Sequence, residues 1–263
     1  IAAQTLVIAY NDPAALDAVF AEHGDRIAAV IVEASAANMG VVAPVTGFNK
    51  LIADTAHEHG ALMILDEVLT GFRVHPAGFW GLQAAAGEDY LPDIVTFGKV
   101  VGGGMPLAAL GGRAEIMDLL APLGPVYQAG TLSGNPLSVA AGLATLRLAA
   151  TEVYDTIDAA SVRLVAALEG ALTEAGVVHS VAKAGNLFNA SFRASAPRDY
   201  AEAQAQDSFR YAPFFHSMRE QGVALPPSVF EAWFLTAAHG EEELRLIEAA
   251  LPAAARAAAG AQV

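Results

Sequence analysis

Along its first 150 residues the chain alternates between stretches with a helical period and short runs of apolar residues. The helical period predicts helices within residues 12–24 and 48–60. Asp12 and Pro13 fit the start of the first helix, as its N-cap and its first-turn residue. The apolar runs predict strands at residues 4–9, 28–34, 61–68 and 93–99. Continuously apolar strands between helices predict an α/β fold with a mainly parallel sheet covered on both faces.

The pattern changes after about residue 150. A period near 3.6 predicts one long helix over residues 152–176, and further helices are expected over residues 212–221 and 241–260. Short apolar pieces between and around them predict strands at residues 177–182, 186–192 and 232–238. The chain is therefore expected to hold two domains, 1–150 in the large α/β domain and 151–263 in a smaller α+β domain.

Composition narrows the class of function. The 263 residues are 54% hydrophobic and 16% charged, as in a globular protein. The net charge of −14 argues against a nucleic-acid partner, and the lack of cysteine excludes disulfides and thiolate metal sites. The sequence has neither a membrane-length apolar run nor a signal-peptide pattern, so we expect a cytoplasmic protein. Because it begins with Ile1, inside a predicted strand, we expect it to be part of a longer polypeptide.

Three ionisable residues fall at or just after the ends of predicted strands: Glu33, Asp66 and Lys99. In a parallel sheet these ends share one edge, where ligands bind. A lysine and an aspartate beside buried strands are costly to desolvate without a partner. They suggest a carbonyl cofactor held as a Schiff base, with an acid beneath its ring. The alternatives are a solvated lysine before a glycine turn, Gly102 to Gly104, and a strand-end aspartate that caps the next element.

Two other features have competing interpretations. Thr131, in QAGTLSGNP, precedes a predicted helix and fits an anion site, although an N-cap by Ser133 or Asn135 is also common. His57 and His59 lie two residues apart on one helix and point to different faces, so no metal site is expected.

Several strings together carry a family resemblance. They are ASAANMGVV (34–42), ILDEVLTGFRV (64–74), FGKVVGGGMP (97–106), GPVYQAGTLSGNP (124–136) and PPSVFEAWF (226–234). On these strings the whole chain resembles the class III pyridoxal-phosphate aminotransferases of fold type I. The strings are closest to a branch that transfers an amino group within one substrate molecule. The chain departs from the family at Ala34, where proline is usual, and at Ala37, where glycine is usual.

The resemblance implies roles for the residues that match the family's motifs. Lys99 would form the Schiff base with pyridoxal phosphate and would shuttle protons. The cofactor would also occur in its pyridoxamine phosphate form. Asp66 would hold the protonated ring nitrogen, and Val68 would pack on the ring face opposite the substrate.

The same resemblance implies a shared active site. Gly130 and Thr131 would bind the phosphate of the neighbouring subunit's cofactor, which makes the enzyme a homodimer. Asn38 would lie near the cofactor's 3-hydroxyl group and the substrate, and Glu231 would line the substrate pocket. The family's N-terminal phosphate cradle, ring-stacking aromatic residue, carboxylate-binding cation and gating loop have no counterpart in this sequence.

Two other functions stay open on the residues alone. One is a class III transaminase that takes an ω-amine and needs a separate keto-acid acceptor. The other is a non-catalytic binding protein on the same fold, against which the joint presence of Lys99, Asp66 and Thr131 argues.

Overall fold

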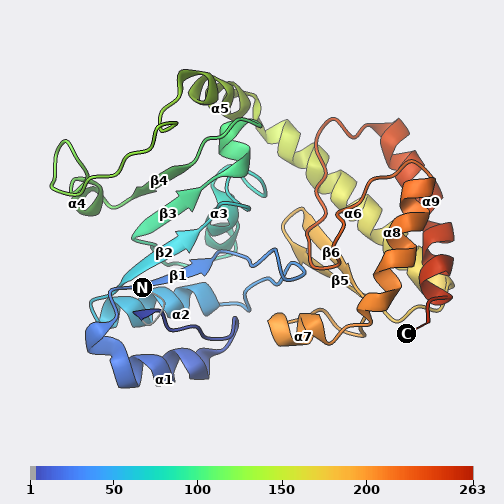
Figure 1. The fold of residues 1–263 in the computed structure, drawn as a ribbon, viewed down its shortest axis with the longest axis horizontal. Helices are drawn as coiled ribbons and strands as arrows, with labels where there is room; N and C mark the ends of the chain where they lie inside the picture. The colour runs from blue at the N-terminus through green and yellow to red at the C-terminus, as the bar shows by residue number, and fades with distance from the viewer. Residues whose placement is uncertain (1–3, 263) are drawn as a thin grey trace. The chain divides into compact units, whose positions relative to one another are not determined.

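The computed structural model describes residues 4–262 and divides into two compact units (Figure 1). The first unit consists of Ile1–Ala34 and Pro44–Ala150, and the second of Ser35–Ala43 and Thr151–Val263. The short segment Ser35–Ala43 thus packs with residues that follow it by more than a hundred positions.

The first unit contains a sheet with strand order β1-β2-β3-β4. Strands β1 (Ala29–Glu33), β2 (Leu62–Asp66) and β3 (Ile94–Phe97) are parallel, and β4 (Ala109–Gly112) is antiparallel to β3. The predicted mainly parallel α/β fold is therefore confirmed. The other elements of this unit are α1 (Pro13–His23), η2 (Gly24–Arg26), α2 (Phe48–Glu58), α3 (Gly78–Ala85), η3 (Lys99–Gly102), α4 (Ala114–Met117) and α5 (Pro136–Leu148).

Helices α1 and α2 lie on one side of this sheet (Figure 1). Helix α2 contacts β1 and β2, and α1 packs against α2. Asp12 caps α1 as predicted, with its Oδ1 accepting a hydrogen bond of 2.9 Å from the Ala15 N–H. Burial alternates along β2, so that Met63 and Leu65 are fully buried while their neighbours are half-buried. On the same half-covered face, Ile31 of β1 is 65% exposed.

Two predicted strands are wrong. Residues 4–9 form no strand within the described part of the chain, and the Val7 side chain is 88% exposed. Residues 232–238 make only an isolated bridge, between Trp233 and Phe188. An apolar run marks a segment that can become a strand, but a ladder also needs a neighbouring strand to pair with. The short, glycine-containing β4 was missed for the opposite reason, because it pairs without a strand-like sequence.

The second unit packs helices around a two-stranded antiparallel sheet of β5 (Ser180–Ala184) and β6 (Leu187–Ser191). Its helices are α6 (Thr151–Glu174), α7 (Tyr200–Gln204), η4 (Ser208–Arg210), α8 (Tyr211–Glu220) and α9 (Glu241–Ala259), of which α6, α8 and α9 match the prediction. All side chains of β6 are buried. The core of this unit includes Leu164, Leu168, Leu172, Phe188, Phe214, Met218 and Leu251. None of the helices in residues 4–262 is long and apolar enough to span a bilayer.

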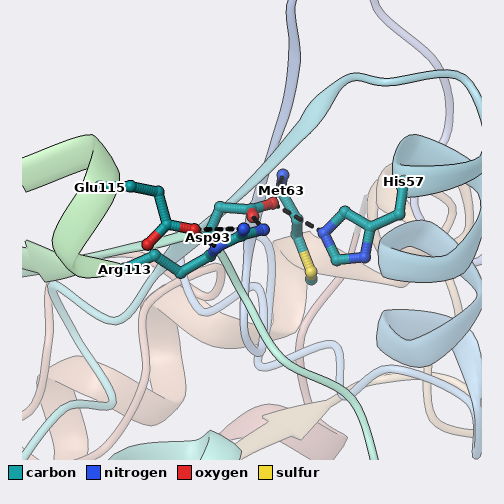
Figure 2. A network of polar contacts seen from close by, with 5 residues as sticks. All are labelled: His57, Met63, Asp93, Arg113 and Glu115. Carbon is teal, nitrogen blue, oxygen red and sulfur yellow. Dashed lines mark hydrogen bonds and ion pairs between the residues drawn. The ribbon is translucent and has the colours of Figure 1, made fainter.

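A buried carboxylate joins the strands at the edge of the sheet where β2 and β3 begin (Figure 2). Asp93 is fully buried, and its oxygens accept hydrogen bonds from the Met63 N–H at 2.7 Å and from Arg113 at 2.9 Å. The His57 ring lies 2.8 Å from the same carboxylate. Burial alone would raise the pKa of Asp93, but these hydrogen bonds outweigh it and hold the pKa below its ordinary value. The Asp93 network thereby links β2, β3, α2 and the residue after β4.

We expect Asp93→Asn to lower the free energy of unfolding by about 2–3 kcal/mol at neutral pH, because buried donors lose a charged acceptor. The folded-state pKa of Asp93 lies below its ordinary value of 3.8. Its contribution is therefore present above that value and is lost as the pH falls through the lowered pKa. Denaturant unfolding of the full-length polypeptide at neutral and acidic pH measures the effect.

Asp54→Asn is the matched control, because Asp54 pairs with Lys50 on the exposed face of α2. That change should have little effect on stability. An Asp93→Asn protein as stable as the unmodified one at neutral pH would contradict the role of the network.

Candidate active site

The parallel register aligns the strand ends that the sequence singled out. Glu33 of β1 pairs with Asp66 of β2, and Asp66 pairs with Thr96 of β3. Paired residues of neighbouring strands project from the same face of a sheet, and all three side chains are half-buried. Lys99 follows Thr96 by three residues, at the start of η3. The strand ends therefore bring two carboxylates to one edge, with a lysine just beyond it.

Lys99 has an unusual backbone conformation. Its φ is 47°, in the left-handed region, which costs a non-glycine residue about 1–2 kcal/mol. Its side chain is exposed within the described residues, although the sequence suggested a buried amine. A strained non-glycine residue at a strand end is the kind of outlier that points to a functional site.

The turns after β2 and β3 are in direct contact. The Glu67 N–H donates to the Thr96 carbonyl at 2.9 Å. The Val68 N–H donates to Asp66 Oδ1 at 2.8 Å, which orients the carboxylate. A Cβ atom at Gly98 would lie 3.0 Å from Val68 Cγ1, so the missing side chain lets Val68 approach the residue before Lys99. Asp66, Val68 and Lys99 thus belong to one local structure.

The glycines after Lys99 serve the packing of helix α5. A Cβ at Gly103 would overlap Thr145 Oγ1 and lie 2.8 Å from the Ala141 carbonyl oxygen, both on α5. Conversely, a Cβ at Gly142 of α5 would overlap the Val101 carbonyl oxygen. At Gly104 a Cβ would have open space around it, so among these glycines it is the positive φ of 88° alone that favours glycine there. Gly103 thus makes room for helix α5.

Glu67 is a site residue that the sequence analysis passed over. Its side chain is fully buried, and its carboxylate accepts hydrogen bonds from the Thr70 hydroxyl, the Phe79 N–H at 2.9 Å and the Trp80 N–H at 2.8 Å. Burial raises the pKa of Glu67. A Cβ at Gly78 would lie 2.6 Å from both carboxylate oxygens, so that position needs glycine. Glu67 therefore anchors the start of α3 directly behind Asp66, and the spacing E-x-x-T was the available clue in the sequence.

Gly130 and Thr131 lie in an exposed turn before α5. The Ser133 N–H donates to the Gly130 carbonyl at 2.9 Å. The N-cap of α5 is Asn135, whose Oδ1 accepts from the Leu137 N–H at 3.0 Å. Gly130 and Thr131 are both exposed, so the turn forms an accessible surface.

Asn38 and Glu231 both belong to the second unit. Asn38 is exposed, and Glu231 is half-buried. Their loops meet at one hydrogen bond of 2.9 Å, from the Gly40 N–H to the Phe230 carbonyl. The structure therefore brings together the segments that carry these two predicted residues.

The histidines give no metal site. His57 lies against Asp93, and His59 Nδ1 lies 3.0 Å from the Thr55 carbonyl. In residues 4–262 no group of three or more His, Cys, Asp or Glu side chains is arranged to hold a metal ion.

The fold agrees with the comparison to known proteins. The family described as aminotransferase class III matches residues 5–251, and the chain belongs to this family. A curated relative from Cutibacterium acnes, named glutamate-1-semialdehyde 2,1-aminomutase, is 61% identical over 258 residues. The match covers 98% of this chain and 59% of the relative, so the chain spans less than two thirds of the relative's length.

Solved structures have the same fold. An ω-transaminase from Sphaerobacter thermophilus has a TM-score of 0.86 and 27% identity, over 95% of this chain and 57% of that chain. A glutamate-1-semialdehyde-aminomutase from Pseudomonas aeruginosa PAO1, in complex with PMP, has a TM-score of 0.83 and 28% identity, over 95% of this chain and 56% of that chain. The predicted resemblance to class III aminotransferases is confirmed.

We expect Gly103→Ala to lower the free energy of unfolding by at least about 2 kcal/mol, because the new methyl group meets α5 and the backbone has a positive φ. Gly111→Ala is the matched control, since nothing lies within 4 Å of a Cβ there and its φ is not positive. Denaturant unfolding of both full-length variants measures the difference. Equal stabilities would contradict the close packing of α5 on η3.

Proposed function

We propose that the full-length polypeptide containing this chain is a pyridoxal-phosphate-dependent aminomutase. It would convert glutamate-1-semialdehyde to 5-aminolevulinate, a step of tetrapyrrole (porphyrin) synthesis, by moving the amino group within the substrate. The identity of 61% to a curated relative with that name carries the proposal. In this proposal residues 1–150 are the C-terminal part of the large cofactor-binding domain, and residues 151–263 are the small domain. The expected cytoplasmic location stays a prediction.

The residues at the strand ends fit the cofactor. Asp66 offers a carboxylate whose Oδ1 is oriented by the Val68 N–H, which suits a protonated ring nitrogen. Val68 offers methyl groups beside Gly98, which suits a ring face. Lys99 offers an exposed amine on the next turn. When bound, pyridoxal phosphate or its pyridoxamine form withdraws electrons from the substrate carbon that loses a proton.

Lys99 would hold the cofactor through its Nζ and carry the proton between substrate and cofactor carbons. Proton transfer by a positioned amine contributes typically about 10²–10⁴-fold to the rate. Asp66 would keep the ring nitrogen protonated by charge pairing, while Glu67 holds the turn behind it.

We also propose a homodimer with shared active sites. Gly130 and Thr131 would bind the phosphate group of the partner's cofactor, with the Thr131 hydroxyl as a donor. Large apolar side chains flank this turn and are exposed. They are Leu123, Val126, Tyr127 (83% exposed), Leu132 and Leu137. A contiguous segment of this kind suits a buried interface.

In the second unit, Glu231 would contact the substrate, and Asn38 would lie near the cofactor's 3-hydroxyl group and the substrate. The substrate has an aldehyde where ordinary amino acids have a carboxylate. The carboxylate of Glu231 would repel the carboxylate that ordinary amino acids have at this place and would so disfavour them as amino donors.

A second candidate function is an intermolecular ω-transaminase. The similarity to the Sphaerobacter thermophilus ω-transaminase, at a TM-score of 0.86, favours it on fold alone. The two functions differ in their need for an amino acceptor, because the aminomutase returns the amino group to the same carbon skeleton.

We expect the purified full-length holoenzyme to form 5-aminolevulinate from glutamate-1-semialdehyde with no added amino acceptor. Product formation is followed by a colorimetric assay, with and without added keto acids. Activity that appears only with a keto acid would favour the transaminase, and no activity under either condition would favour the non-catalytic alternative.

Lys99→Ala should lower turnover by at least about 10³-fold, because one amine would both hold the cofactor and move protons. Its cofactor absorbance should also differ, since no lysine bond can form at this position. The control is Lys183→Ala, which removes an exposed lysine of β5 and should leave activity unchanged. Substantial turnover by Lys99→Ala would overturn the assignment.

A further inference from the structure

A buried side chain on β6 binds the loop that carries Glu231 at two points. The loop, residues 226–231, has no helix or strand of its own. Asn189 of β6 lies next to it, and its Nδ2 donates to the Val229 carbonyl at 2.9 Å and to the Glu231 carbonyl at 2.7 Å. One amide thus binds the backbone on both sides of Phe230.

Asn189 is suited to this task by burial and by chemistry. Its side chain is only 1% exposed, on a strand whose residues are all buried. The two carbonyl acceptors determine which end of the amide is the NH2 group. No carboxylate or aliphatic side chain of similar size supplies two donors at one atom. Asparagine at this position is therefore explained by its two hydrogen bonds to the loop and not by packing in the core.

Other contacts hold the same loop from different directions. The Gly40 N–H donates to the Phe230 carbonyl at 2.9 Å, and the Tyr211 hydroxyl donates to the Pro226 carbonyl. Beyond the loop, the Trp233 N–H donates to the Phe188 carbonyl at 2.8 Å, on the residue before Asn189. Asn189 is the central contact of this set and the one nearest to Glu231.

We propose that Asn189 is a positioning residue that fixes the backbone of Glu231 and, through it, the enzyme's discrimination between its substrate and ordinary amino acids. The inference rests on the proposed function of Glu231. Asn189 does not touch the substrate. It sets where the Glu231 carboxylate is presented, and a displacement of about 1 Å in such a group can cost about 10²-fold in rate.

The test uses the full-length holoenzyme and compares two reactions. One is 5-aminolevulinate formation from glutamate-1-semialdehyde, expressed as kcat/KM. The other is the conversion of the bound cofactor to its amine form by glutamate, followed by absorbance. Asn189→Leu should lower the ratio of the first to the second by about tenfold or more. An unchanged ratio would overturn the proposal.

Ser161→Ala is the matched control. Ser161 is also buried in the second unit, where its hydroxyl donates to the Asn186 carbonyl at 3.0 Å, away from the Glu231 loop. This change costs a buried hydrogen bond and some stability, but the ratio should stay within about twofold of the unmodified enzyme. A similar loss of selectivity in Ser161→Ala would mean that general destabilisation explains the result.

A double-mutant cycle shows whether Asn189 acts through Glu231. In the Glu231→Gln background, Asn189→Leu should change the ratio little further, because the group that it positions is already neutral. Additive losses would assign Asn189 a role independent of Glu231. A wild-type enzyme that forms no 5-aminolevulinate would instead refute the proposed function itself.

Two further measurements apply if Asn189→Leu does not fold. Asn189→Asp has the same shape but places a carboxylate against two carbonyl oxygens, and it should lower selectivity in the same direction. In the unmodified enzyme, the Gly40 amide should exchange its hydrogen slowly, because it is bonded to a loop that Asn189 holds. Fast exchange at Gly40 would show that the loop is not held and would overturn the proposal.

Discussion

The register of the parallel strands is the constraint on which the first unit depends. A shift of one residue would turn Asp66 to the opposite face of the sheet and separate it from its neighbours on β1 and β3. The Asp93 network binds β2, β3 and the residue after β4 at the other edge, where side chains take no part in the proposed chemistry. The placement of the strand-end residues thus relies on a buried carboxylate at the opposite end of the same strands.

Much of the fold was predictable because burial leaves a pattern along the chain. Strand β2, which ends at Asp66, and strand β3, which precedes Lys99, were found from apolar runs that end in ionisable residues. Residues 4–9 and 232–238 have the same apolar character but no ladder among the described residues, and pairing is a property of two segments rather than one.

The candidate site was predictable only where position along a strand determines position in space. Glu67 and Asn189 were missed because their partners lie many residues away, at Phe79 and Trp80 for one and at Val229 and Glu231 for the other. Both are buried polar side chains that bind backbone groups, Glu67 at the start of α3 and Asn189 in the loop of Glu231. Burial strengthens the hydrogen bonds that these side chains make, so each favours a single conformation of the backbone that it binds, although Asn189 Oδ1 has no hydrogen-bond partner within the described residues.

At position 99, selection for stability and selection for the reaction favour different residues, because the backbone of Lys99 is left-handed. Glycine would adopt a φ of 47° without strain and would stabilise the turn by about 1–2 kcal/mol, yet it has no amine. Sequences that drift toward stability alone should therefore lose the lysine readily, whereas sequences under selection for the reaction must keep an unfavourable residue there. In this family, a glycine at this position would accordingly mark a protein that has been released from its chemistry while its fold persists.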